Sequence, residues 1–325
     1  MATALLIFLL LPSVPHPAHA QGGTWHSFTY NGPTGSRPYF VYTPANYHPG
    51  TPVPLLVMLH GCTQTAADFA AGTQMDLLAD AHQFLVVYPQ QTPQNNPASC
   101  WNWPLPTNQA RGSGEPALLV GIVQTVEQNR SQWSIDRSRV FVAGASAGAV
   151  MAVILGATYP DLFAAIGVVA GGEFPAGASR PGGLDPLVAG KMAYQAMGSY
   201  ARVVPAIVFQ GSADPVVAPK NGDLVVQQWM ETDRLASHGH YNANWASPSQ
   251  VITADPPLSH PYVERRWNDA SGQEVQEYWV AIGAGHAWTG GSPSGTFTDP
   301  LGPNISQALY NFFLTHDFSQ HVNSR

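Results

Sequence analysis

A serine stands at the centre of the pentapeptide Gly144-Ala145-Ser146-Ala147-Gly148, between an apolar run typical of a strand and a segment typical of a helix. A strand that enters a helix through so short a corner strains the central residue and holds its side chain clear of the sheet. The helix N-terminus adds the free N–H of Ala147 and a dipole that favours negative charge. We therefore predict that Ser146 is a nucleophile rather than an inert serine in a turn.

A serine hydroxyl needs a general base, and the base needs an acid that orients it. In a strand–serine–helix arrangement of this kind, the acid and then the histidine follow the serine along the chain. Asp214 comes directly after the predicted strand 206–209, and His286 follows the predicted strand 275–282. Both therefore project from the sheet edge that carries Ser146. We predict a catalytic triad of Ser146, His286 and Asp214.

Other acids and histidines of the chain are less suited to the same roles. The alternative acids lie on a predicted helix or in a long loop: Asp223, Asp233 and Asp255. The alternative histidines do not directly follow a strong strand: His238, His240, His260, His316 and His321.

The segment Leu59-His60-Gly61-Cys62 follows another predicted strand, 55–59. Acyl transfer needs N–H donors that hold the negative oxygen of the intermediate, and each is typically worth about 3 kcal/mol. We predict that the backbone N–H groups of Cys62 and Ala147 form this oxyanion hole. His60 is expected to hold the loop through side-chain hydrogen bonds, and a direct catalytic part for it is the less favoured alternative.

Cys62 and Cys100 are the only cysteines of the chain. Their two loops leave neighbouring predicted strands, so we predict that they form a disulfide, with two free thiols as the alternative. The bridge would close a loop of roughly forty residues, worth about 4 kcal/mol in the chain-entropy model. It would also hold the loop that carries Trp101 and Trp103 beside the oxyanion hole. Two cysteines do not make a metal site, and we expect neither metal nor cofactor.

The elements that must position these residues alternate along the chain. The sequence predicts strands at 55–59, 84–88, 140–143, 165–169, 206–209 and 275–282. It predicts helices at 66–83, 116–133, 147–158, 224–237 and 305–314. Alternation of this kind indicates an α/β fold, with a mostly parallel sheet covered by helices on both faces. The stretches 90–115, 171–203 and 238–261 are rich in Gly, Pro and Asn. We interpret them as long loops that form the walls of the site.

The first twenty residues are typical of a signal peptide. Leu5 to Leu11 form an apolar run, and Ala18-His19-Ala20 places small residues before a cleavage site, although no Lys or Arg precedes the run. We predict a signal peptide at 1–20, a single catalytic domain at 21–325, and secretion or export to the periplasm. The apolar run is too short to span a bilayer.

Charged residues make up only 10% of the chain, and the net charge is −7. Because no stretch is basic, nucleic acid is an unsuitable partner. No later stretch resembles a membrane span. We expect a monomer whose partner is an ester substrate.

Several motifs resemble those of polyhydroxybutyrate depolymerase-type esterases: His60-Gly61-Cys62-Thr63-Gln64, Cys100-Trp101-Asn102-Trp103, Gly144 to Gly148, and Gly285-His286-Ala287-Trp288-Thr289-Gly290-Gly291. The resemblance covers about residues 25–318. It implies a single α/β-hydrolase domain, the triad given above, and action on polyhydroxyalkanoate-type polyester, its oligomers or short-chain esters. Similar chains act as feruloyl or acetylxylan esterases on plant cell walls, which is the alternative function.

The resemblance also raises two expectations about the substrate. Depolymerases of this kind often have a further substrate-binding domain, whereas this chain stops at Arg325, so we expect oligomers, amorphous polyester or small esters. Trp101, Trp103 and Trp288 lie next to the predicted site and either form an aromatic rim for the substrate or pack their loops. A non-catalytic binding protein on the same scaffold is the remote alternative.

Overall fold

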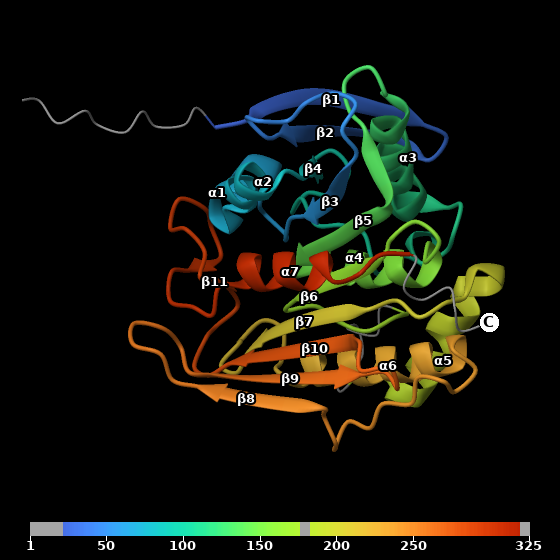
Figure 1. The fold of residues 1–325 in the computed structure, drawn as a ribbon. Coiled ribbons are helices and arrows are strands. Elements are labelled where there is room, and N and C mark those ends of the chain that lie inside the picture. Colours follow the sequence, from blue (N-terminus) through green and yellow to red (C-terminus); the bar gives the residue numbers. More distant parts are fainter. Residues whose placement is uncertain (1–21, 176–182, 319–325) are drawn as a thin grey trace, which may run out of the picture.

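The computed structural model describes residues 22–175 and 183–318. The predicted signal peptide at 1–20 lies outside the described residues. A twisted ten-stranded sheet runs through the described part, in the order β1-β2-β4-β3-β5-β6-β7-β10-β9-β8 (Figure 1). Its strands are β1 (Thr24–Gly32), β2 (Gly35–Thr43), β3 (Val53–Leu59), β4 (Leu85–Pro89), β5 (Ile135–Ala145), β6 (Ala165–Val169), β7 (Ala206–Gly211), β8 (Gln250–Ala254), β9 (Tyr262–Asn268) and β10 (Glu274–Ala281).

The central strands are parallel, from β4 through β3, β5, β6 and β7 to β10. Antiparallel strands complete both margins, with β1 and β2 on one side and β9 and β8 on the other. This arrangement confirms the predicted mostly parallel sheet. Because the central strands share one direction, their carboxyl ends meet at a single edge, where α/β folds place their sites.

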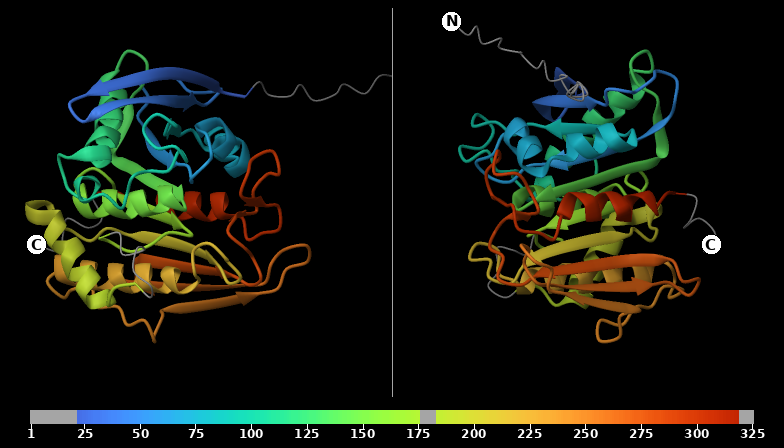
Figure 2. Two further views of the ribbon diagram at one scale, coloured as in Figure 1. Left: turned by 180° about the vertical axis from the view of Figure 1, so that it is seen from behind. Right: turned by 60° about the vertical axis from the view of Figure 1, so that its left-hand side comes forward.

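Helices cover both faces of the sheet, as predicted. They are α1 (Ala66–Thr73), α2 (Met75–His82), α3 (Gly114–Gln128), α4 (Ala147–Thr158), α5 (Pro186–Met197), α6 (Lys220–Ala236) and α7 (Ile305–Leu314). The side chains of α1, α2 and α7 form the core on one face, and those of α3 to α6 form the core on the other. The view from behind in Figure 2 shows α5 and α6 in front of the sheet.

Strand β3 shows how one segment serves both cores. Leu55, Val57 and Leu59 are buried in the core beneath α3 and α4, whereas Leu56 and Met58 are buried on the opposite face. Successive side chains of a strand point to opposite faces, so a strand covered on both sides must be apolar throughout. This is why the predicted strands read as continuous apolar runs.

The structure corrects several predicted boundaries. The helix predicted at 66–83 is two helices, because Gln74 adopts the left-handed region with φ 55° and caps α1. The stretch 171–203, predicted to be a loop, holds α5, and the loop predicted at 238–261 holds β8. The hairpin of β1 and β2 and the marginal strand β9 were not predicted, because their half-exposed, mixed sequences lack the apolar runs of the central strands.

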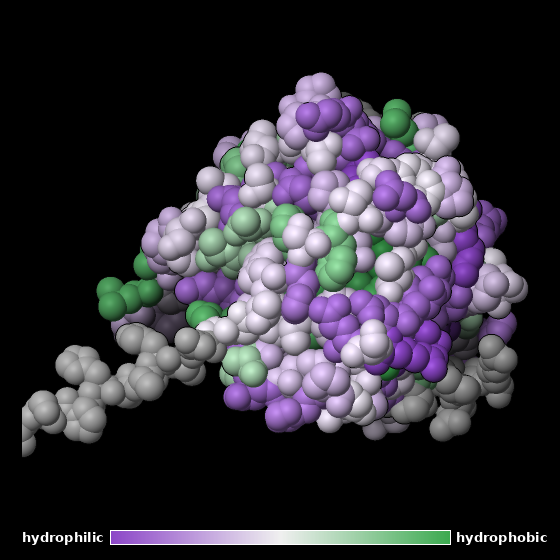
Figure 3. Space-filling model, turned by 90° about the horizontal axis from the view of Figure 1, so that it is seen from above, coloured by the Kyte–Doolittle hydropathy of each residue, from purple (hydrophilic) through white to green (hydrophobic). Residues whose placement is uncertain are grey.

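The surface above the sheet margin formed by β1 and β2 is mostly hydrophilic or neutral, and hydrophobic residues form only small, separate patches on it (Figure 3). Along β1, exposed and half-buried residues alternate. A polar marginal strand is a common protection against pairing with other chains. Within residues 22–175 and 183–318, no helix has the length and apolar character needed to cross a membrane.

Candidate active site

Ser146 lies at a one-residue corner between β5 and α4. Its backbone has φ 54° and ψ −119°, which is strained for a residue with a side chain. The corner brings the neighbouring backbones so close together that only glycine fits on either side of it. A Cβ atom on Gly144 would lie 2.4 Å from the carbonyl carbon of Gly148, and one on Gly148 would lie 2.0 Å from the carbonyl oxygen of Leu59. The predicted close approach of strand and helix is therefore present.

Asp214 and His286, which are 72 residues apart, are in direct contact. The distance between His286 Nδ1 and Asp214 Oδ2 is 2.8 Å. Asp214 follows β7 and His286 follows β10, and these strands are parallel neighbours. Backbone hydrogen bonds tie the two loops together, from the Ser212 N–H to the Ala281 carbonyl (2.9 Å) and from the Ala213 N–H to the Ala284 carbonyl (3.0 Å). These hydrogen bonds join the two loops directly.

The surroundings of Asp214 keep its carboxylate ionised. Burial by itself raises the pKa of Asp214. The hydrogen bond from His286 and those from the backbone N–H groups of Val217 and Val216 outweigh burial and hold the pKa below its ordinary value. Because an ionised carboxylate only accepts hydrogen bonds, the His286 proton must reside on Nδ1. Nε2 is then the ring nitrogen that can accept a proton.

Ser146 and His286 line the same pocket, of about 210 Å³, at the carboxyl edge of the sheet. Cys62 and Gly61 contribute from the loop after β3, and Val216 and Phe297 from loops on the other side. Most of the remaining lining is apolar. All three residues of the predicted triad thus lie at or beside one pocket.

The two predicted oxyanion donors lie on segments beside Ser146, one in the pocket wall and one next to Ser146 in the chain. Cys62 lines the pocket beside Ser146, and Ala147 is the first residue of α4. Within the described part of the chain, neither backbone N–H donates to a protein acceptor. The first N–H groups of a helix have no partner inside the helix, so Ala147 can serve a bound anion.

His60 is fully buried and uses both ring nitrogens to hold loops. Nδ1 donates to the Gly61 carbonyl (2.7 Å), and Nε2 accepts from the Gln91 N–H (3.0 Å). Burial lowers the pKa of His60, which fits a neutral ring with one donor and one acceptor. The predicted structural role is therefore confirmed.

A buried ion pair between Arg37 and Glu115, at 2.8 Å, was not predicted. Glu115 also accepts hydrogen bonds from the Gln91 side chain (2.6 Å) and the Asn102 backbone N–H (2.6 Å). Through Gln91 the network reaches His60. The sequence prediction placed Glu115 at the end of the loop 90–115, and that position carries no information about a partner 78 residues away.

Cys62 and Cys100 form a disulfide, as predicted, with a sequence separation of 38. The bridge joins the loop after β3 to the loop that carries Trp101 and Trp103. Besides the contact of His60 with Gln91, hydrogen bonds join the same loops from the Trp101 indole N–H to the His60 carbonyl (3.1 Å) and from the Thr63 N–H to the Ala98 carbonyl (2.7 Å).

The three tryptophans proposed as a substrate rim occupy different environments. Trp101 is 1% exposed and belongs to the core beneath α3 and α4, outside the pocket lining. Trp288 lines the pocket but is 2% exposed, and its indole N–H donates to the Ser306 hydroxyl (3.0 Å). Trp103 is half-buried against the same core as Trp101. Phe297 and Val216, which sequence reasoning did not single out, occupy the rim instead.

The alternative acids and histidines lie apart from Ser146 or have other partners. Asp223 accepts from the Tyr278 hydroxyl (2.9 Å), and Asp233 is buried beside Gln276 (2.9 Å). His260 contacts Asp299 at 2.7 Å. The remaining candidates are exposed or buried elsewhere, or lie outside the described residues: Asp255, His238, His240, His316 and His321.

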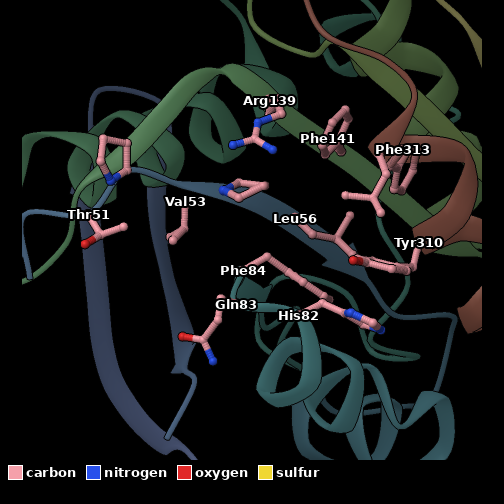
Figure 4. A pocket seen from close by; sticks show the side chains of 13 residues that line it. Thr51, Val53, Leu56, His82, Gln83, Phe84, Arg139, Phe141, Tyr310 and Phe313 are labelled. Carbon is pink, nitrogen blue, oxygen red and sulfur yellow. The ribbon is translucent and has the colours of Figure 1, made fainter. Parts of the chain in front are cut away.

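A second cavity, of about 270 Å³, lies at the amino ends of β3 and β4, opposite the Ser146 pocket. Val53, Leu56, Phe84 and Phe141 line it, with Arg139 at one side (Figure 4). It contains no serine–histidine pair among the described residues, so we place the candidate site at the carboxyl edge. Among residues 22–175 and 183–318, no group of three or more His, Cys, Asp or Glu side chains could hold a metal ion.

Comparisons with known proteins show which family this chain resembles. The family model Esterase PHB depolymerase matches residues 38–244. Poly(3-hydroxyalkanoate) depolymerase C of Paucimonas lemoignei is 35% identical over 243 residues, which are 72% of this chain and 54% of that protein. Acetylxylan esterase A of Talaromyces purpureogenus is 28% identical over 284 residues, 79% of this chain and 68% of that protein. The chain thus spans about half the length of the depolymerase.

Among solved structures, an acetyl xylan esterase from Aspergillus awamori superposes with a TM-score of 0.68. The match has 23% identity and covers 90% of this chain and all of the other. This likeness shows a shared α/β-hydrolase fold. Because the family model matches residues 38–244 and a depolymerase is 35% identical, the chain belongs to the PHB depolymerase esterase family.

Proposed function

We propose that this protein is a serine carboxylic-ester hydrolase that uses Ser146, His286 and Asp214. The observation that carries the proposal is the strained Ser146 in a pocket it shares with a histidine held by a buried carboxylate. A serine or histidine with a purely structural role would not require this combination of backbone strain, a shared pocket and a buried carboxylate. Family membership gives independent support.

In the first step, Ser146 Oγ attacks the ester carbonyl carbon while His286 Nε2 takes the hydroxyl proton. Asp214 keeps the ring in the required tautomer and stabilises the imidazolium. The backbone N–H groups of Cys62 and Ala147 donate to the oxygen that becomes negative. When the tetrahedral intermediate collapses, the C–O bond to the alcohol breaks and His286 returns its proton to the leaving oxygen.

In the second step, water replaces the alcohol. His286 takes a proton from water, the resulting hydroxide adds to the acyl carbon, and the bond to Ser146 Oγ breaks. The acid leaves and Ser146 regains its proton. The overall reaction consumes one water for each ester bond, and these steps use only side chains and backbone groups of the chain.

We propose polyhydroxyalkanoate-type esters, their oligomers or short-chain esters as substrates. The rim of the pocket supports an apolar substrate, since Val216 and Phe297 are 68% and 52% exposed there. Leu258, Ile282 and Leu301 are also exposed, in loops at the same end of β10. Exposed apolar side chains at the rim of a pocket, here Val216 and Phe297, favour an apolar partner.

Feruloyl or acetyl esters of cell-wall xylan are the second candidate, supported by the acetylxylan esterase relatives. Sugars usually bind by stacking on exposed aromatic rings and by hydrogen bonds. Because Trp101 and Trp288 are buried, they offer no such platform. Phe297 is the exposed aromatic ring that lines the pocket, and a single ring gives a sugar chain little surface for stacking, so the polysaccharide is the less favoured substrate.

The nucleophile is tested with Ser146→Ala and hydrolysis of p-nitrophenyl butyrate. We expect a loss of at least about a thousandfold in kcat, because the oxyanion donors alone provide only a small residual rate. Ser247→Ala is the matched control, since this serine is exposed in the loop before β8, at the end of the sheet opposite the pocket, and the activity of this variant should persist. Wild-type activity in Ser146→Ala would refute the assignment.

The substrate is tested by comparing amorphous polyhydroxybutyrate, hydroxybutyrate oligomers, methyl ferulate and acetylated xylan with one enzyme preparation. We expect the highest kcat/KM on hydroxybutyrate oligomers. Faster release of acetate or ferulate would favour the second candidate.

We further propose that the protein acts outside the cytoplasm. The disulfide supports this, because such bonds persist in oxidising compartments. Expression of the full chain followed by N-terminal sequencing of the exported protein tests it. A mature N-terminus at Gln21 is expected, and retention of residues 1–20 in the cytoplasm would contradict the proposal.

A further inference from the structure

We propose that Gln64 is a positioning residue that fixes the oxyanion loop and couples it to the loop after His286. The proposal rests on the function proposed above. Gln64 is buried and lies two residues after Cys62, whose N–H is the proposed oxyanion donor. It belongs to no helix or strand, and its side chain contacts two separate parts of the site.

The Gln64 amide uses both of its ends. Its Oε1 accepts from the Gly61 N–H at 2.9 Å. Its Nε2 donates to Asp68 Oδ2 and to the Thr296 carbonyl, both at 3.0 Å. The orientation of the amide follows from chemistry, because a backbone N–H requires an oxygen whereas a carboxylate and a carbonyl require a donor. Both N–H bonds of the amide are satisfied.

Asp68 reinforces the bridge from its own side. Its Oδ1 accepts from the Thr296 N–H (3.0 Å) and its Oδ2 from the Thr296 hydroxyl (2.6 Å). Asp68 sits in the first turn of α1, where Thr65 caps the helix by accepting from the Asp68 N–H (3.1 Å). The start of α1 therefore anchors Gln64 and Thr296 together.

Each end of the bridge lies next to a reacting group. On one side, a Cβ atom on Gly61 would lie 3.4 Å from Ser146 Cβ, so the loop packs directly against the serine. On the other side, Phe297 follows Thr296, faces the His286 ring edge-on with 6.4 Å between centroids, and accepts from the Trp288 N–H (2.8 Å). A shift at Gln64 must therefore move the oxyanion loop relative to the histidine loop.

The kinetic test uses Gln64→Leu, which keeps the volume but removes both hydrogen-bonding ends. A donor displaced by a fraction of an ångström stabilises the transition state less and the bound ester little differently. We expect kcat to fall about 10- to 100-fold while KM changes less than about threefold. Inhibition by a trifluoromethyl ketone, which mimics the tetrahedral intermediate, should weaken by the same factor as kcat/KM.

Gln64→Glu separates the two ends, because a glutamate can still accept from Gly61 but when ionised cannot donate to Asp68 or Thr296. The ratio of its kcat to the wild-type kcat should rise as the pH falls and the new carboxyl becomes protonated. A ratio independent of pH would contradict the bridging role of the donor end.

Gln276→Leu is the matched control. Gln276 is equally buried and also donates to an aspartate, Asp233 (2.9 Å), but it lies at the amino end of β10, opposite the pocket. We expect this variant to lose stability and to keep the wild-type kcat. If both variants lose activity only in proportion to the unfolded fraction, Gln64 is merely structural and the proposal is wrong.

Hydrogen exchange gives a readout that does not depend on catalysis. Gln64→Leu should speed amide exchange in both 60–65 and 288–298, and Gln276→Leu in neither. Faster exchange in 60–65 alone would overturn the coupling. If Ser146→Ala keeps its activity, the proposed function fails, yet this measurement still decides whether Gln64 couples the two loops.

Discussion

Removing the disulfide should destabilise the fold far more than it slows catalysis. The change is the double substitution Cys62→Ala and Cys100→Ala, which leaves no unpaired thiol. The sequence separation of 38 sets the loop that the bridge closes in the unfolded chain. The chain-entropy model then predicts a loss of about 4 kcal/mol in the free energy of unfolding, or a Tm lower by roughly 10 °C.

The effect on activity should be small below the unfolding transition. Three hydrogen bonds still join the two loops after the bridge is removed. They run from the Trp101 indole to the His60 carbonyl, from the Thr63 N–H to the Ala98 carbonyl, and from the Gln91 N–H to the His60 ring. Because these hold the backbone around Cys62, we expect kcat at 25 °C to fall less than about tenfold.

Urea unfolding followed by tryptophan fluorescence gives the free energy, and p-nitrophenyl butyrate hydrolysis gives kcat. Wild-type protein treated with dithiothreitol is the control for the substitutions. A loss below about 1 kcal/mol would refute the loop-closure reasoning. An inactive but fully folded variant would show that the disulfide, rather than the hydrogen bonds, holds the oxyanion loop.

Three further predictions concern single residues. Gly148→Ala should remove most of the activity and lower the free energy of unfolding by at least about 2 kcal/mol, because the new Cβ would lie 2.0 Å from the Leu59 carbonyl oxygen. Thermal unfolding measures the stability and ester hydrolysis measures kcat. Near-wild-type values of both would contradict this packing. Asp214→Asn should lower kcat by about 10⁴ by favouring the wrong histidine tautomer, with the fold unchanged by circular dichroism. Burial raises the pKa of Asp76 to about 6, so the folded protein keeps a proton that the unfolded chain releases near pH 4. The free energy of unfolding should therefore fall by roughly 3 kcal/mol as the pH rises from about 4 to about 6, and Asp76→Asn should flatten that slope in urea titrations at each pH.

The sequence predicted the parts of this protein that depend on local pattern and chain order. Continuous apolar runs identified the central strands, and α4 and α7 begin and end at the predicted residues. Strands that are buried on both faces must be apolar throughout, which is why they could be predicted from their continuous apolar runs. Ser146, Asp214 and His286 were predicted to lie together because the carboxyl ends of parallel strands meet at one edge of the sheet, so that position in the chain predicts position in space.

Contacts between distant residues were decided only by the tertiary structure. The pairing of Arg37 with Glu115 and of Gln64 with Thr296 joins residues 78 and 232 positions apart, and no local spacing encodes either contact. The burial of Trp101 could not be predicted from the sequence either, since a tryptophan beside a site has the same local sequence whether it is buried or exposed. The sequence by itself therefore determined the fold class and the residues suited to the chemistry. Only packing between distant segments decided how those residues are held, and which apolar side chains surround the pocket they share.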